Sequence, residues 1–209
     1  MPSARLASLL SDHAVLRLAW HNLAVVIPGR LYRSNHPTPS RLAATAARLG
    51  LRTIVNLRGE APNPSTALSS AEAARLGLDH VYMAFESRGA PHRDRILRFH
   101  GIYSTMRFPA LLHCKSGADR AGLAAGLALL FEGGSAAEAA RQLSFRYLHI
   151  SRSPTGILDA FFRLYAAEGE GKKPFLDWVR EDYHEEDLRR RFRAGGIMSF
   201  LNDRLLARE

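Results

Sequence analysis

The chain has 209 residues, of which 46% are hydrophobic and 23% charged, a balance typical of a folded globular protein and not of a disordered one. Its net charge of +9 indicates anionic partners: nucleic acid, an acidic membrane surface or a phosphorylated substrate, although an arginine-rich genomic composition would give the same charge. The single cysteine excludes an internal disulfide and a multi-cysteine zinc site, which favours a reducing, cytoplasmic compartment.

The first element, residues 1–22, is predicted to be helical. Asp12, His13, Arg17 and His21 interrupt its apolar residues, so the segment lacks the continuous apolar stretch of a signal peptide or a membrane span. Two placements fit such a helix: one face packed against the domain, which we favour, or a basic amphipathic helix lying on a membrane.

From residue 24 to residue 131, short apolar or β-branched runs alternate with segments of helical periodicity. This alternation predicts an α/β fold with a mostly parallel central sheet flanked by helices. Strands are expected at residues 24–27, 31–32, 53–57, 80–85 and 110–114, and helices at residues 39–49, 69–76, 91–106 and 121–131.

Beyond Ser135 every periodic segment is helical, which predicts a helical C-terminal extension. The stretch 169–173, Gly-Glu-Gly-Lys-Lys, is the best candidate for a flexible break. We expect an N-terminal helical segment at 1–22, an α/β domain at 23–168, and a helical extension at 169–209 packed on the same domain. The helices of this region are expected at residues 136–145, 155–167, 173–183 and 185–206.

One segment, residues 110–122, has an evident chemical pattern. It reads Ala-Leu-Leu-His-Cys-Lys-Ser-Gly-Ala-Asp-Arg-Ala-Gly, so Cys114 ends a predicted strand and Arg120 starts a predicted helix, with five residues between them. Five residues can curl so that successive backbone N–H groups point inward and form a nest for a tetrahedral dianion. The following helix adds the positive end of its dipole. The pattern predicts a phosphate-binding loop.

The side chains of this loop fit a nucleophilic reaction on phosphate. The planar fork of Arg120 can clasp two phosphate oxygens, which a lysine cannot do. Cysteines at helix N-termini beside cations ionise readily, so Cys114 is expected to be a thiolate nucleophile. Gly117 permits the tight bend and Ser116 can donate a hydrogen bond. The substrate-binding positions of the loop are expected to be Lys115, Ser116, Gly117 and Ala118.

The octapeptide His-Cys-Lys-Ser-Gly-Ala-Asp-Arg at 113–120 resembles the HC-X5-R signature of the protein tyrosine phosphatase superfamily, in its small dual-specificity-like branch. Residues 29–34 and 50–58 also look like the N-terminal half of such domains, and the resemblance covers about residues 25–167. It implies a reaction without metal or cofactor, in which Cys114 forms a phosphocysteine that water then hydrolyses. Arg120 and the loop amides would stabilise the charge on the equatorial oxygens.

The sequence departs from the family pattern at two positions. Ala121 stands where the family usually has Ser or Thr, whose hydroxyl helps to break down the phosphoenzyme. Ser87 stands where the mobile acid loop usually has Asp, in a segment, 85–91, that otherwise matches the outline of that loop. Another carboxylate must therefore protonate the leaving group.

Three carboxylates are candidates for this general acid. Asp119 lies inside the loop beside Arg120, and this arrangement resembles myotubularin-type phosphatases, in which a loop Asp at that position is the acid. Glu86 is adjacent to the vacant position, and Asp94 follows on the next helix. We favour Asp119 because its place near the phosphate does not depend on loop closure.

Further residues receive subsidiary roles. Lys115, similar to the loop lysine of lipid-directed relatives, and Arg88 in the acid-loop region are expected to bind the substrate. His113 is expected to fix the loop by hydrogen bonds, and Arg33 and Arg58 to form structural ion pairs. No metal site is expected. The remaining histidines lack metal-ligand spacing and are interpreted as surface or core residues: His36, His80, His92, His100, His149 and His184.

The resulting hypothesis is a phosphomonoester hydrolase acting on a phosphotyrosine protein or a phospholipid-like anion. A phosphate-binding relative without catalysis and a rhodanese-like sulfur transferase are the alternatives, since both can have a loop Cys followed by Arg. A nucleic-acid arm at 185–193 is disfavoured, because its charges are mixed in sign and the segment does not match a recognised nucleic-acid binding module. The sequence does not determine the oligomeric state.

Overall fold

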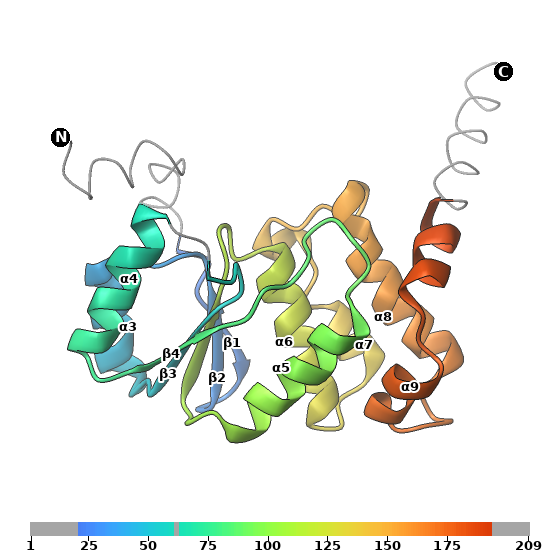
Figure 1. Ribbon diagram of the computed structural model, residues 1–209, viewed down its shortest axis with the longest axis horizontal. Helices are drawn as coiled ribbons and strands as arrows, with labels where there is room; N and C mark the ends of the chain where they lie inside the picture. Colours follow the sequence, from blue (N-terminus) through green and yellow to red (C-terminus); the bar gives the residue numbers. More distant parts are fainter. Residues whose placement is uncertain (1–20, 61–62, 194–209) are drawn as a thin grey trace, which may run out of the picture.

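The computed structural model describes residues 21–60 and 63–193, and its centre is a five-stranded sheet in the order β1-β2-β5-β3-β4 (Figure 1). β1 runs antiparallel to β2, and every other neighbouring pair is parallel. The predicted α/β class with a mostly parallel sheet is therefore confirmed. The strands are β1 (Ala24–Ile27), β2 (Leu31–Ser34), β3 (Thr53–Asn56), β4 (Asp79–Tyr82) and β5 (Ala110–His113).

Side chains of the central strands alternate between two apolar layers, as the two-residue period of a strand requires. Ile54 and Leu111 face one layer, formed with α3 (Pro39–Leu49) and α4 (Pro64–Arg75). Val55 and Leu112 face the other and larger layer. The strands are thus buried on both faces, which explains their continuous hydrophobic composition. The helices on the larger layer are α5 (Arg93–Thr105), α6 (Asp119–Phe131), α7 (Ala136–Ala140), α8 (Ile157–Glu168) and α9 (Phe175–Glu181).

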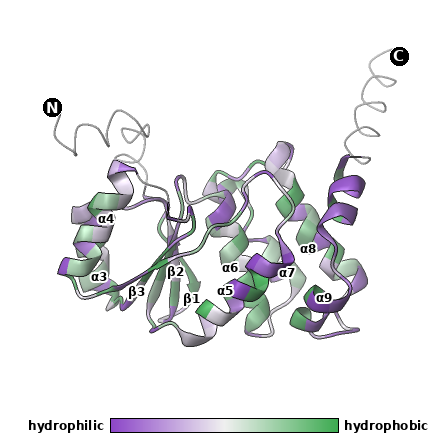
Figure 2. Ribbon diagram, viewed as in Figure 1, coloured by the Kyte–Doolittle hydropathy of each residue, from purple (hydrophilic) through white to green (hydrophobic). Residues whose placement is uncertain are grey.

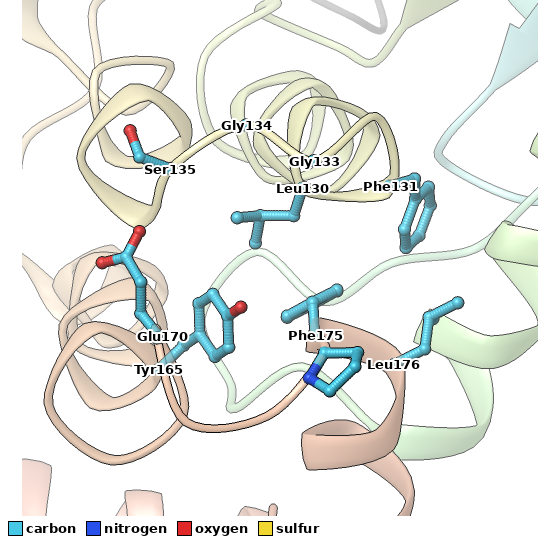
Figure 3. Close-up of a pocket in the computed structure, with 11 residues that line it drawn as sticks. Leu130, Phe131, Gly133, Gly134, Ser135, Tyr165, Glu170, Phe175 and Leu176 are labelled. Carbon is cyan, nitrogen blue, oxygen red and sulfur yellow. The ribbon is translucent and has the colours of Figure 1, made fainter.

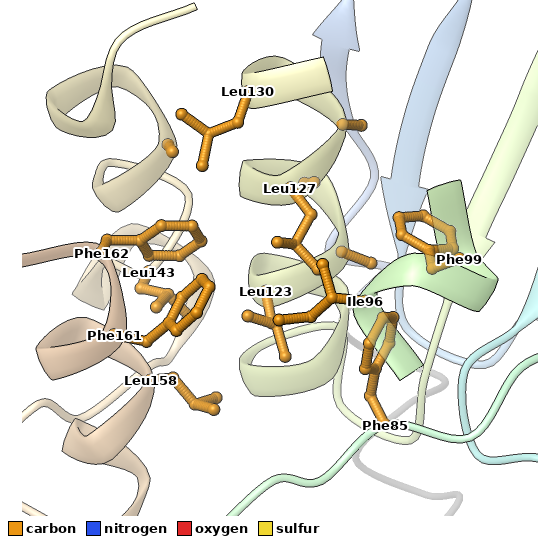
Figure 4. Packing of buried hydrophobic residues seen from close by; sticks show 14 of the residues in the cluster. Phe85, Ile96, Phe99, Leu123, Leu127, Leu130, Leu143, Leu158, Phe161 and Phe162 are labelled. Carbon is orange, nitrogen blue, oxygen red and sulfur yellow. The ribbon is translucent and has the colours of Figure 1, made fainter. Parts of the chain in front are cut away.

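Helix α6 lies in the middle of the larger layer and is apolar on all sides (Figure 4). Leu123 and Leu127 lie between Ile96 of α5 and the aromatic rings of Phe161 and Phe162 on α8. Figure 2 shows α6 as mainly hydrophobic, with hydrophilic residues gathered on α5 and α9. Because its position is fixed from every side, α6 provides a rigid base for the loop that precedes it.

Two predicted helix boundaries were wrong by five residues, whereas the others within the described residues differ by at most two. Helix α4 begins at Pro64 instead of residue 69, because the side chain of Asn63 accepts a hydrogen bond from the Thr66 amide and proline is favourable in the first turn. Helix α7 ends at Ala140 instead of residue 145. The Gln142 carbonyl beyond it accepts from the Arg33 guanidinium at 2.6 Å, so it is not available to continue the helix.

The chain after Gly169 continues with α9, which packs on α5 and α6, and with a helix over residues 185–193. The remainder of that predicted helix, and the N-terminal helix predicted at 1–22 apart from its last two residues, lie outside the described residues. The domain limits at 22 and 168 stay a prediction. None of the helices in the described part of the chain is long and apolar enough to span a membrane.

Candidate active site

The candidate site follows β5, the middle strand of the sheet. Its parallel neighbours β2 and β3 end level with it, with His113 in register with Ser34 and Asn56. Cys114 is the next residue, 2% exposed, and α6 begins at Asp119. The loop therefore lies at the carboxyl edge of the sheet, where ligands bind in open α/β folds.

Arg33 of β2 supports the loop from behind. Its guanidinium is fully buried and donates to the carbonyls of Gly117 at 2.7 Å and Ala118 at 2.9 Å. The other arm of the fork reaches Gln142, and the cation lies 4.0 Å from the centre of the Tyr147 ring. Burial lowers the pKa of Arg33 to about 10, and at neutral pH the group remains charged. The predicted ion-pair role of Arg33 is thus replaced by hydrogen bonds to loop carbonyls.

Two more loop carbonyls are held from outside. Asn22 donates its side-chain amide to the Ser116 carbonyl at 3.0 Å, and the backbone N–H of His36 lies 3.4 Å from the Lys115 carbonyl. Four consecutive carbonyls, 115–118, thus have partners outside the loop. Because C=O and N–H point in opposite directions across a trans peptide, the N–H groups of residues 116–119 are directed away from these carbonyl partners, and the N–H of Ala118 donates to the Ser116 hydroxyl oxygen at 3.3 Å. This orientation is compatible with the predicted anion nest, which stays a prediction.

Gly117 makes the curvature of this loop possible. Its φ is +77°, in the left-handed region that glycine adopts without steric cost. A Cβ atom there would lie 2.6 Å from the Asn35 backbone nitrogen and 2.8 Å from the Ser34 carbonyl carbon. The loop therefore packs against the end of β2 with no room for a side chain.

The predicted loop residues differ in their exposure to solvent. Gly117 and Ala118 are buried, whereas Lys115 and Ser116 are exposed. Arg120 is half-buried in the first turn of α6, and among the described residues its guanidinium has no ion pair or hydrogen-bond partner. The loop thus combines a buried thiol, carbonyls bonded from outside and a guanidinium without a partner among the described residues, and an anion beside Cys114 is what such an arrangement can bind.

Comparison with known proteins decides the family. Residues 21–153 match the family model PTP-SAK, described as a Swiss Army Knife protein, DSP-PTPase phosphatase domain. The match covers more than half of the chain. The chain belongs to this family. The resemblance to dual-specificity-like cysteine phosphatases noted from the loop sequence is confirmed, whereas the roles of individual loop residues stay predictions.

Solved structures of several phosphatases have the same fold. The core catalytic domain of the PP-IP phosphatase SIW14 from S. cerevisiae, in complex with citrate, is 17% identical, with a TM-score of 0.50 over 85% of this chain and 94% of that chain. A DUF442 protein from Shewanella putrefaciens CN-32 has a TM-score of 0.55 at 17% identity, over 72% and 94%. PTPMT1 has a TM-score of 0.50 at 14% identity, over 69% and 96%. Among curated proteins, none matches this chain.

Within this phosphatase domain, Asp119 has a partner that sequence reasoning missed. Its carboxylate lies 2.8 Å from Nδ1 of His149, whose Nε2 lies 2.7 Å from the carboxylate of Asp159. His149 was interpreted only as a surface or core residue. No spacing in the sequence connects these three residues, because Asp119 and His149 are 30 positions apart.

The other two acid candidates have different surroundings. Glu86 forms an ion pair with Arg95, and its carboxylate also lies 3.5 Å from Nε2 of His92. Asp94 is exposed in the first turn of α5, where a carboxylate stabilises the helix dipole. Arg88, predicted to bind substrate, is exposed between β4 and α5. Glu86 is thus engaged in holding its segment to α5, whereas Asp119 is part of the loop itself.

His113 was expected to fix the loop through hydrogen bonds, and this was wrong for its side chain. The ring is completely buried, and neither nitrogen has a hydrogen-bond partner in the described part of the chain. It packs edge-on against His36, with ring centres 4.7 Å apart, and His36 in turn is anchored at Ser65 and Ser69. Burial lowers the pKa of His113 well below its usual value, so the ring is neutral. Its contribution is packing behind Cys114.

A separate hollow of about 460 Å³ lies at the other end of α6 (Figure 3). Leu130, Tyr165 and Phe175 line it, and Glu170 stands at its margin. Because Cys114 precedes the first turn of α6 and this hollow adjoins the last, it is not part of the phosphate site. Among the residues that the structure describes, no group of three His, Cys, Asp or Glu side chains has the arrangement of a metal site.

Proposed function

We propose that this protein hydrolyses phosphate monoesters through a phosphocysteine formed on Cys114. The observation that carries the proposal is that four consecutive carbonyls, 115–118, have hydrogen-bond partners outside the loop, which directs the opposite, N–H side of these peptides away from those partners, to the side where we place the phosphate. Arg120, in the first turn of α6, adds a fork that fits two oxygens of a phosphoryl group. The loop lies directly after a buried cysteine, so a bound phosphorus would meet the sulfur.

The reaction has two displacements. The Cys114 thiolate attacks phosphorus, the bond from phosphorus to the ester oxygen breaks, and that oxygen takes a proton from Asp119. A water molecule then attacks the phosphocysteine, its proton passes to Asp119, and the thiolate and inorganic phosphate are released. Arg120 and the loop N–H groups stabilise the three equatorial oxygens in both steps. With Ala121 after Arg120, no hydroxyl at that position assists the second step.

The surroundings of the loop favour a monoester with an apolar group. The segment 145–152 is joined to the site through Asn22, which binds the Tyr147 carbonyl at 3.1 Å. This segment exposes Phe145 (78%), Leu148 and Ile150, an unusual density of apolar side chains beside a polar loop. A phosphotyrosine protein or a phospholipid-like anion would supply both the dianion and the apolar group. The exposed Lys115 and Arg88 would bind a further anionic group of either substrate.

The first test is hydrolysis of p-nitrophenyl phosphate with a chelator present. Wild type should turn over, Cys114→Ser should lose essentially all turnover while still binding phosphate, and Arg120→Lys should lose about 10²- to 10³-fold in kcat/KM. Arg98→Lys, an exposed arginine of α5, is the matched control and should behave as wild type. Turnover by Cys114→Ser would remove the phosphocysteine from the mechanism.

The second test separates the substrate classes. Phosphotyrosine peptides and an anionic phosphomonoester lipid in vesicles are compared, each with wild type and Phe145→Ser. A loss confined to the vesicle substrate would assign the lipid class, and a loss confined to the peptide the protein class. Phosphate binding without any turnover would favour the non-catalytic alternative, and turnover of thiosulfate alone the sulfur transferase.

A further inference from the structure

An unusual side-chain arrangement at the end of the loop is a row of two carboxylates with a buried imidazole between them. His149 is completely buried and touches Asp119 at 2.8 Å through Nδ1 and Asp159 at 2.7 Å through Nε2. Ser151 donates to the second oxygen of Asp159 at 2.9 Å. The two carboxylates come from different helices, Asp119 from the start of α6 and Asp159 from the first turn of α8.

These contacts determine the charge of the imidazole. Burial alone lowers the pKa of His149, but hydrogen bonds to Asp119 and Asp159 and the charges of both carboxylates outweigh it and raise that pKa to about 9. At neutral pH the ring is therefore an imidazolium, and both ring N–H groups donate to carboxylates. Arg33, a cation on β2, lies over the neighbouring Tyr147 ring and donates to the loop carbonyls.

We propose that His149 is a positioning residue that supplies the proton of Asp119, and that Asp159 holds His149 in place for this exchange. The inference rests on the proposed function, since it concerns the acid of that reaction. The acid is then a pair: Asp119 touches the leaving group, and the buried His149 holds the proton behind it, shielded from solvent.

The proton balance of both steps can be written out. As the ester oxygen leaves, Asp119 gives it a proton and takes one from Nδ1 of His149, which becomes a neutral imidazole with its remaining proton on Nε2, toward Asp159. In the second step the attacking water gives its proton to Asp119, and Nδ1 is protonated again. No proton is left over, and the thiolate, the carboxylates and the imidazolium return to their starting state.

A merely structural role is the competing explanation. The same contacts join the segment 145–152 to α6 and α8, and their loss would loosen that segment whatever the reaction needs. The two roles differ in their dependence on the leaving group. Loss of a proton source slows poor leaving groups far more than good ones, whereas a loosened site slows both alike.

The test uses two substrates and two substitutions. His149→Asn keeps a side-chain N–H near the position of Nδ1 but cannot release a proton, and Asp159→Asn keeps the shape of the Asp159 side chain but removes its charge. We expect His149→Asn to lower kcat/KM less than 10-fold for p-nitrophenyl phosphate and about 10² to 10³-fold for an alkyl phosphate. Asp159→Asn should show the same trend more weakly. The control is His100→Gln, which alters a half-buried ring on α5 away from the loop and should change neither substrate.

The possible outcomes test the proton relay separately from the phosphocysteine reaction. Equal losses for both substrates, or a loss of thermal stability alone, would overturn the relay and leave the phosphocysteine reaction standing. A wild type inactive on both substrates would overturn the proposed function and the relay with it. Unchanged kinetics of His149→Asn for the alkyl phosphate would likewise eliminate the relay.

Thermal unfolding against pH gives an independent readout of the imidazolium. A pKa raised from 6.5 to about 9 means that His149 stabilises the folded state fully below about pH 6.5. This stabilisation is lost as pH rises through about 9. The difference in Tm between wild type and His149→Asn should therefore be large at pH 6 and shrink toward pH 10. A difference independent of pH would contradict a charged, proton-storing ring.

Discussion

Arg33 places a positive charge, fully buried, behind the loop at residues 114–120. Burying a cation is unfavourable unless hydrogen bonds replace its water, and here two loop carbonyls and Gln142 do so. The cation serves the loop twice: it fixes the carbonyls of Gly117 and Ala118 outward, and its charge favours an anion on the inner side. A lysine at this position has no planar fork and could reach only one of these carbonyls.

Arg33→Lys should therefore lower the free energy of unfolding by about 2 kcal/mol, since hydrogen bonds to charged groups contribute about 1.5–3 kcal/mol each. It should also lower kcat/KM at least 10-fold, because the freed carbonyl lets the loop turn. Urea unfolding followed by circular dichroism measures the first, and p-nitrophenyl phosphate hydrolysis the second. Arg180→Lys is the control: Arg180 pairs with Asp177 at the surface, and less than 1 kcal/mol is expected. Equal effects of the two substitutions would contradict the supporting role of Arg33.

At the scale of elements, glycines in the loop, in α6 and in α5 have different surroundings. Gly117 gives the loop its positive φ and its close approach to β2. Gly126 lies in the interior of α6, where an added Cβ would come within 2.5 Å of the Phe162 ring and 2.9 Å of the Ala139 carbonyl oxygen. Gly101 is exposed in α5 with nothing within 4 Å. The same substitution should therefore have three different results.

Gly117→Ala should abolish most activity, by 100-fold or more, because the nest cannot keep its curvature. Gly126→Ala should lower stability by about 1–3 kcal/mol through overpacking while the folded protein keeps its activity. Gly101→Ala should raise stability by about 0.5–1 kcal/mol, since alanine is the better helix former. Activity and urea unfolding of the three variants distinguish these results. An active Gly117→Ala variant would mean that the loop does not need its observed conformation.

At the scale of the whole molecule, the predictable part of this structure is the part encoded by neighbours in sequence. The strand at 110–113, the five-residue loop and the helix after it followed from local pattern, as did the alternation that gives the sheet. Asn22, Arg33 and His149 were not assigned to the site, because their contacts join residues 94, 84 and 30 positions apart. Contacts between residues so far apart depend on the order of the strands in the sheet and on the path of the segment after α7. Neither can be deduced from the spacing of residues along the sequence.

The C-terminal extension is the large-scale feature whose relation to the domain can be tested directly. Trp178 of α9 is buried against Phe161 and Tyr183. The Tyr183 hydroxyl donates to the Pro91 carbonyl at 2.7 Å, and Glu185 accepts from the Arg93 amide at the start of α5. The extension thus shares an aromatic core with α8 and holds the end of the acid-loop region.

These contacts predict that extension and domain unfold together. The chain has two tryptophans, and Trp20→Phe leaves Trp178 as the one fluorescent reporter of its kind. In urea, the fluorescence of Trp178 and the far-ultraviolet circular dichroism of the whole chain should change at the same midpoint, as a two-state transition requires. Trp178→Ala removes most of a buried aromatic side chain and should lower the free energy of unfolding of the entire protein by about 3–5 kcal/mol. The urea midpoint measured by circular dichroism should fall by that amount divided by the m-value, the slope of the free energy against urea concentration. A fluorescence transition at clearly lower urea would show that the extension is a separate folding unit. The contacts of Tyr183 and Glu185 with residues 91–93 would then break before the domain unfolds.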